Sequence, residues 1–214
     1  MPRMSEFLTD DETVAYGRYA MAPTWAELEK VFFLDDEDRA LIARRRGDHM
    51  KFGFALQLVT VRHVGMFLED PLDVPVVVLE FVAEQLGIED SSCVKRYTER
   101  DKTRFDHAWE IARVYHLKEF TEVEGELRAW VTARSWTSGD GPKAIFTDAV
   151  AWLRERDVLL PGVTTLTRLV TNVKEETTQR LWTLLESLLT VGQRYVLDQL
   201  LEVSSGSRVS DLER

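Results

Sequence analysis

Between residues 34 and 65 the chain carries the signatures of two helices that are separated by only a few residues. Asp35 is a good N-cap for the first helix, and Asp38 adds negative charge in its first turn, where the helix dipole favours it. Gly47 then permits a tight turn, and Asp48 can cap the second helix. A helix, a short turn with glycine and another helix make a helix-turn-helix candidate.

The second of these helices is expected to have one apolar and one polar face. Its apolar residues recur at i, i+3, i+4 and i+7: Phe52, Ala55, Leu56 and Val59. The opposite face carries polar residues: His49, Lys51, Gln57 and Thr60. The turn before it holds three arginines: Arg44, Arg45 and Arg46. In a DNA-binding unit of this kind, the second helix lies in the major groove while the turn contacts phosphate.

The net charge of −10 argues against DNA binding, because DNA-binding proteins replace phosphate counterions with basic side chains. The charge is unevenly distributed, however. Residues 39–62 hold six basic residues against one acid, Asp48, and residues 93–118 hold seven against four. Exposed charges more than about 8–10 Å apart are largely screened at physiological salt, so a local basic patch can still bind DNA.

A second helical group is expected after Glu69-Asp70-Pro71, with helices over about 75–86, 91–97 and 99–116. The last is the longest and is basic at its start, which gives the group homeodomain-like proportions. Its inward stripe is expected to contain five positions: Phe105, Ala108, Trp109, Ala112, and Tyr115 or His116. Three residues are candidates to face the groove: Lys102, Arg104 and His107. Three more suit phosphate contact on the approach to this helix: Lys95, Arg96 and Arg100.

The whole set of candidate DNA-binding residues therefore combines both basic regions. It consists of Arg44, Arg45, Arg46, His49, Lys51, Arg62, Lys95, Arg96, Arg100, Lys102, Arg104 and His107.

No alternating strand pattern of useful length occurs, so we predict an all-α fold of two or three small helical bundles. The breaks at residues 69–71 and 138–142 suggest three parts. Residues 1–70 are expected to form a helix-turn-helix module, and residues 71–138 a second trihelical DNA-binding module. Residues 139–214 are expected to form a helical connector or a third module.

The sequence contains no pattern that is typical of an active site. It lacks a phosphate loop, a dinucleotide-binding glycine pattern and a serine elbow. The histidines are not spaced as metal ligands and Cys93 is the single cysteine, so we expect no catalytic residue, metal site, cofactor or disulfide. The chain also lacks an apolar signal core and a run of 18 apolar residues. We therefore expect a cytoplasmic protein without membrane contact that is not itself an enzyme.

Four separated blocks resemble the N-terminal region of the large replicative transposases of the Tn-three family (TnpA). They are DRALIARRRGDHMKFGFALQLVTVRHVG, VPVVVLEFVAEQLG, YTERDKTRFDHAWEI and LLPGVTTLTRLV, in the family's order. The resemblance implies that the chain recognises the terminal inverted repeats of a transposon as double-stranded DNA. It also implies a much longer parent protein of the metal-dependent DDE type, of which this chain would be an N-terminal fragment; the alternative is a truncated gene. The downstream domains of that parent, and a second copy of it, would be partners, and its catalytic core would lie outside this sequence.

The chain departs from the family at one basic position. Family members tend to have Asn-Arg-Leu-Gly-Phe where this chain has Met50-Lys51-Phe52-Gly53-Phe54. Lysine keeps the charge but loses the bidentate fork with which arginine reads guanine. We therefore expect Lys51 to contact phosphate rather than a base.

Two functions from different classes stay open at this point. One is sequence-specific binding of duplex DNA by helical modules that lie side by side on an inverted repeat. The other is a protein-interaction or dimerisation module, which the acidic remainder of the chain and the leucine-rich stretch 181–201 favour. On the helical pattern alone, a basic helix pair is more often a solvated surface than a DNA reader.

Overall fold

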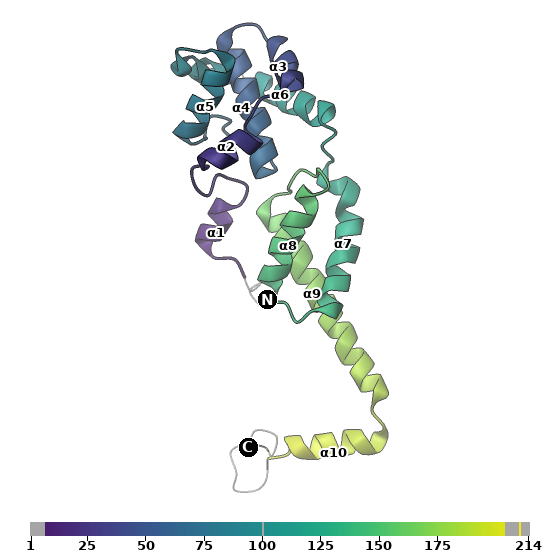
Figure 1. Ribbon diagram of the computed structural model, residues 1–214. Coiled ribbons are helices and arrows are strands. Elements are labelled where there is room, and N and C mark those ends of the chain that lie inside the picture. The colour runs from purple at the N-terminus through teal and green to yellow at the C-terminus, as the bar shows by residue number, and fades with distance from the viewer. Residues whose placement is uncertain (1–6, 100, 204–209, 211–214) are drawn as a thin grey trace.

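The computed structural model describes residues 7–99, 101–203 and 210, and every regular element in that part of the chain is a helix. The prediction of an all-α fold is therefore confirmed (Figure 1). In chain order the helices are α1 (Asp10–Ala15), α2 (Trp25–Val31), α3 (Asp36–Ala43), α4 (Asp48–Val64), α5 (Val76–Leu86), the 3₁₀ helix η1 (Ser91–Glu99), α6 (Asp101–Val114), α7 (Phe120–Thr137), α8 (Pro142–Arg154), α9 (Val163–Leu188) and α10 (Val191–Leu201).

Local sequence signals explain where several of these helices begin and end. The Asp35 carboxylate accepts from the backbone N–H of Asp38 at 2.8 Å, and the Asp38 carboxylate accepts from the backbone N–H of Asp35 at 3.2 Å. This reciprocal capping satisfies two of the free donors at the start of α3. Helices α4 and α5 end at Gly65 and Gly87, whose positive φ angles suit residues without a side chain.

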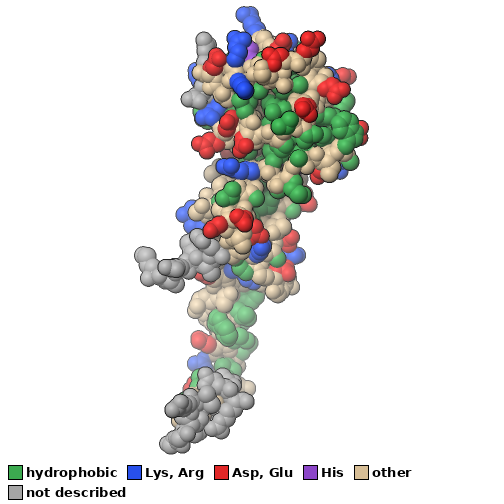
Figure 2. Space-filling model, turned by 90° about the vertical axis from the view of Figure 1, so that its left-hand side faces the viewer, with side chains coloured by type: hydrophobic (Ala, Val, Ile, Leu, Met, Phe, Trp, Pro, Cys, Tyr) green, Lys and Arg blue, Asp and Glu red, His purple; other side chains and the backbone are tan. Residues whose placement is uncertain are grey.

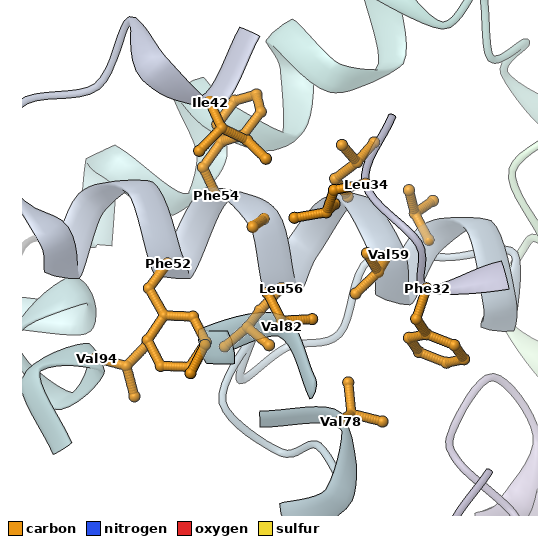
Figure 3. Close-up of a cluster of buried hydrophobic side chains, with 14 of the residues drawn as sticks. Phe32, Leu34, Ile42, Phe52, Phe54, Leu56, Val59, Val78, Val82 and Val94 are labelled. Carbon is orange, nitrogen blue, oxygen red and sulfur yellow. The ribbon is translucent and has the colours of Figure 1, made fainter. Parts of the chain in front are cut away.

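Helix α4 is the centre of the upper of two helical units (Figure 1). Its side chains point in opposite directions, with Phe54 towards Ile42 of α3 and Phe52 towards Val94 of η1 (Figure 3). Helices α2, α5 and α6 cover the remaining sides. Gly53 permits the close approach of η1, because a Cβ at this position would lie only 2.1 Å from Cγ of Tyr97.

The covering of α4 corrects one expectation from the sequence. The short turn between α3 and α4 exists, but all residues from Phe52 to Val61 are buried. Gln57 and Thr60, expected on a polar outer face, make their hydrogen bonds inside the protein, to the Tyr97 and Tyr19 hydroxyls at 3.0 and 2.8 Å. Only the first and last turns of α4 reach the surface, so the length of this helix is not free to enter a DNA groove.

Residues on both sides of the domain border expected at residue 70 share the core of the upper unit. Val59 and Val61 precede this border and Val78 and Val82 follow it, yet all four belong to one hydrophobic cluster. That cluster extends from Leu28 to Ile111. We therefore propose that residues 25–117 form one unit rather than parts of two modules, because α4 needs partners from both sides of residue 70 to be covered.

The lower unit is built from α7, α8 and the first half of α9, which pack together in a three-helix arrangement (Figure 1). Its cluster runs from Phe120 to Val173 and includes the fully buried Leu127, Ile145 and Leu166. The border expected at residue 138 separates α7 from α8, which share this core.

Backbone hydrogen bonds join the two units. The N–H of Leu160 donates to the carbonyl oxygen of Gly65 at 2.9 Å, and an isolated parallel bridge links Lys118 with Val158. The Tyr16 hydroxyl, which follows α1, donates to the carbonyl oxygen of Pro161 at 2.9 Å. The lower unit is thereby attached close to the C-terminal end of α4.

Beyond Thr177, α9 leaves the lower unit, and α10 continues from its end at an angle (Figure 1). No residue of α10 is buried. Much of this projecting arm, residues 178–203, is apolar, and Figure 2 shows hydrophobic side chains along its surface.

Candidate nucleic-acid interface

Basic side chains gather at the end of the upper unit that is farthest from α10. Arg44 and Arg46 lie in the turn between α3 and α4 and are exposed. His49 is half-buried in the first turn of α4, and Lys51 lies 4.0 Å from the Asp48 carboxylate with its side chain partly exposed. Figure 2 shows lysine and arginine side chains at this end, with acidic ones among them.

Two further basic residues, Lys95 and Arg96, join this surface from η1, and both are exposed. The contact between Phe52 and Val94 holds η1 against the start of α4. Burial raises the pKa of the nearby Cys93 thiol, Asp90 and Asp48 raise it further, and Arg96 lowers it. The packing of η1 on α4 brings Lys95 and Arg96 to the end of the upper unit where α4 begins. We call Arg44, Arg46, Lys51, Lys95 and Arg96 the basic surface.

Arg45 stands between two members of this surface but points inward. Its guanidinium lies 2.6 Å from the Glu110 carboxylate of α6 and 4.2 Å from the centre of the Phe54 ring. Its side chain is only 13% exposed. Arg45 therefore fixes the turn against α6, and its charge is already paired.

Arg62 lies at the surface of the upper unit, but its guanidinium is likewise paired. Its guanidinium donates to both carboxylate oxygens of Asp38 at 2.9 and 3.0 Å, and to the carbonyl oxygen of Phe33 at 3.2 Å. The hydroxyl of Tyr115 donates to the same carboxylate. This cluster joins α3, α4 and the end of α6.

Two of the three expected groove-facing residues of α6 are turned towards the rest of the upper unit instead. Arg104 donates to the carbonyl oxygen of Glu69. His107 is half-buried, and its Nδ1 lies 2.9 Å from the Tyr97 hydroxyl. Burial, with the nearby positive charge of Arg45, lowers the pKa of His107 to about 4. His107 is therefore neutral at pH 7 and carries no charge for a phosphate.

The outward face of α6 carries a different set of side chains from the one expected. Ile111 is fully buried and fixes the rotation of the helix. The exposed residues on the opposite side are Lys102, Phe105, Asp106, Trp109, Arg113 and His116. Phe105 and Trp109 were expected to face inward, and this expectation is wrong. Ile111, four positions from His107, is the sequence signal that would have given the correct rotation.

Arg100 lies outside the described residues. In the described part of the chain, no group of three or more histidine, cysteine, aspartate or glutamate side chains is arranged to hold a metal ion. No helix described by the structure is both long and apolar enough to cross a membrane.

Comparisons with known proteins place the chain among transposases. A family model described as a domain of unknown function (DUF4158) matches residues 7–173. The transposase for transposon gamma-delta of Escherichia coli (strain K12) is 41% identical over 211 residues, which are 98% of this chain and 21% of that protein. The transposase for transposon Tn501 of Pseudomonas aeruginosa is 30% identical over 193 residues, 89% of this chain and 19% of the relative.

A third similar protein, the transposase for transposon Tn1546 of Enterococcus faecium, is 26% identical over 200 residues, 93% of this chain and 20% of the relative. The chain thus spans about a fifth of the length of these relatives. Because the family model covers most of the chain and these relatives match nearly all of it, the chain belongs to the DUF4158 family and to the Tn-three family of transposases.

Proposed function

We propose that this chain binds duplex DNA at the terminal inverted repeats of a transposon and serves as the N-terminal part of a transposase in DNA transposition. The basic surface would contact phosphates, and the outward face of α6 would enter the major groove. The observation that carries this proposal is the position of α6. It packs on α4 along one face and leaves its opposite face exposed, and it also contacts η1, which carries Lys95 and Arg96 of the basic surface.

The chemistry of the outward face of α6 suits base recognition. Lys102 can donate to acceptors on guanine, and Asp106 can accept from the amino group of cytosine. Within the described residues neither side chain takes part in a salt bridge, in contrast to Arg45 and Arg62. We therefore assign base recognition to α6 rather than to α4, most of which is buried.

The acidic net charge of the chain is compatible with this proposal. Several acidic groups lie far from the basic surface, among them the Glu155, Glu175 and Glu176 side chains of the lower unit. Their repulsion is screened over more than about 8 Å at physiological salt. Attraction at the basic surface is local, so binding should depend strongly on salt.

The 214-residue chain is expected to shift a duplex of the transposon end in preference to a scrambled duplex of equal length. With about four to six phosphate contacts, the affinity should fall by about 10²–10³-fold between 50 and 200 mM salt. Fluorescence anisotropy titrations of both duplexes over this salt range measure both effects. Equal affinity for the two duplexes at low salt would disprove sequence recognition by this chain.

A second candidate function, self-association, is favoured by the projecting arm. Its large apolar side chains are exposed: Leu181, Trp182, Leu184, Leu185, Leu188, Val191, Tyr195, Val196, Leu197, Leu200 and Leu201. Contiguous exposed apolar surface of this kind marks an interaction site. Residues 180–201 carry two basic and two acidic side chains, so this part of the arm has no net charge. Two copies of the arm therefore do not repel each other, whereas two copies of the acidic remainder of the chain would.

If the arm pairs with a second copy, the chain should form dimers whose fraction rises with concentration. Leu184→Glu with Leu188→Glu should shift the equilibrium to monomer, since two charges would have to be desolvated in the apolar contact. Val76→Glu, at an exposed apolar residue of the upper unit, is the matched control and should leave dimerisation unchanged. Analytical ultracentrifugation measures the equilibrium, and a wild-type chain that stays monomeric at high concentration rules self-association out.

A further inference from the structure

Two large aromatic side chains lie exposed on the outward face of α6. Phe105 is 62% and Trp109 66% exposed, and the two are four residues apart, one helical turn. Large aromatic side chains are usually buried, and an exposed pair on one helix face marks a contact site. They are not needed for packing α6, because Ile111 and Tyr115 on the opposite face make that contact. We call Phe105 and Trp109 the aromatic pair.

Arginine side chains accompany both rings. The guanidinium of Arg113 lies 5.1 Å from the centre of the Trp109 ring, and that of Arg104 lies 4.8 Å from the centre of the Phe105 ring. Lys102 and Asp106 are exposed on the same helix face. An apolar protein surface would have to desolvate Lys102 and Arg113, which is costly. The charges therefore favour a polyanion that also offers apolar groups.

Resting on the proposed function, we infer that the aromatic pair contacts the 5-methyl groups of thymines in the major groove of the bound DNA. The major groove is wide enough for a helix, and the thymine methyl is the apolar group that base edges present there. Aromatic rings pack on this methyl, while Arg113, at one end of the face, extends towards phosphates and Lys102, at the other end, stays available for a guanine. The structure thereby assigns part of the sequence preference to thymine positions.

The test replaces thymines of the transposon-end duplex, one at a time, by uracil, which differs only by the missing methyl group. Loss of one buried methyl contact should weaken binding of the wild-type chain about fourfold at each contacted position. In Phe105→Ala or Trp109→Ala, uracil at the thymine that the removed ring contacts should have no further effect, since the partner of that methyl group is already gone. Anisotropy titrations give all four affinities of each cycle.

Trp182→Ala provides the matched control, because Trp182 is similarly exposed, at 58%, but lies in the projecting arm. This variant should retain the full uracil effect. Thermal melting should show that all three variants fold like the wild type, as expected for exposed positions.

Two results would overturn the inference. One is a wild-type chain that binds every uracil-substituted duplex as tightly as the thymine duplex. The other is a loss of affinity in Phe105→Ala or Trp109→Ala that is equal for thymine and uracil duplexes, which would assign the rings to stacking. Both results leave the preference for the end duplex over a scrambled duplex in place, so failure of this inference is distinguishable from failure of the proposed function.

Discussion

The triple variant Arg44→Ala, Arg46→Ala, Lys95→Ala is expected to bind DNA several hundredfold more weakly than the wild type at about 0.1 M salt. Each lost phosphate contact removes about 0.9 from the slope of log affinity against log salt, so three contacts reduce the slope by about 2.7. The loss should be similar for transposon-end and scrambled duplexes, since phosphates carry no sequence information. Anisotropy titrations at several salt concentrations give both the affinity and the slope.

A control of equal charge change separates a local effect from a general one. Lys30→Ala, Arg168→Ala, Arg180→Ala also removes three exposed positive charges, from α2 and α9. We expect a decrease of only a few-fold, because the removed charges lie away from the basic surface and are screened. Equal losses in the two triple variants would contradict the assignment of phosphate contacts to the basic surface. Arg45 is left intact in both, because its removal would unpair the half-buried Glu110.

Asp38→Ala is expected to lower the free energy of unfolding by about 2–4 kcal/mol. Its buried carboxylate binds Arg62, accepts from Tyr115 and caps the backbone of Asp35. Truncation leaves these donors without their acceptor. The expected loss lies below that for a fully buried ion pair, because the Arg62 side chain is 31% exposed and water can replace part of the interaction. Urea denaturation followed by helicity and tryptophan fluorescence measures it.

Asp36→Ala is the matched control in the same helical turn. Asp36 is exposed and interacts mainly with the dipole of α3, so its removal should cost about 0.3–1 kcal/mol. Asp38→Asn keeps a carbonyl oxygen for the cap and should lie between the two. If Asp38→Ala is as stable as Asp36→Ala, the cluster that joins α3, α4 and α6 does not stabilise the upper unit.

Local sequence signals determined the helical class of this protein and the position of several helix ends. The capping pair Asp35 and Asp38, and the glycines that follow α4 and α5, act within a few residues, so no knowledge of distant contacts is needed to interpret them. The resemblance of four blocks to the Tn-three family also came from the sequence, and the comparisons with known transposases confirm it. These features are local in the chain, and the sequence alone was sufficient for them.

Only the tertiary structure decided which faces of α4 and α6 are free. Both helices carry apolar residues on more than one side, so helical spacing did not distinguish a buried polar residue such as Gln57 from an exposed one. The rotation of α6 is set by the buried Ile111. The burial of α4 depends on η1, which packs closely because Gly53 leaves space for the Tyr97 ring. Whether an arginine is available to bind a phosphate likewise depends on which residues face it in the folded protein. Arg45 and Arg62 meet carboxylates from other helices, while Arg44 and Arg46 remain open to solvent.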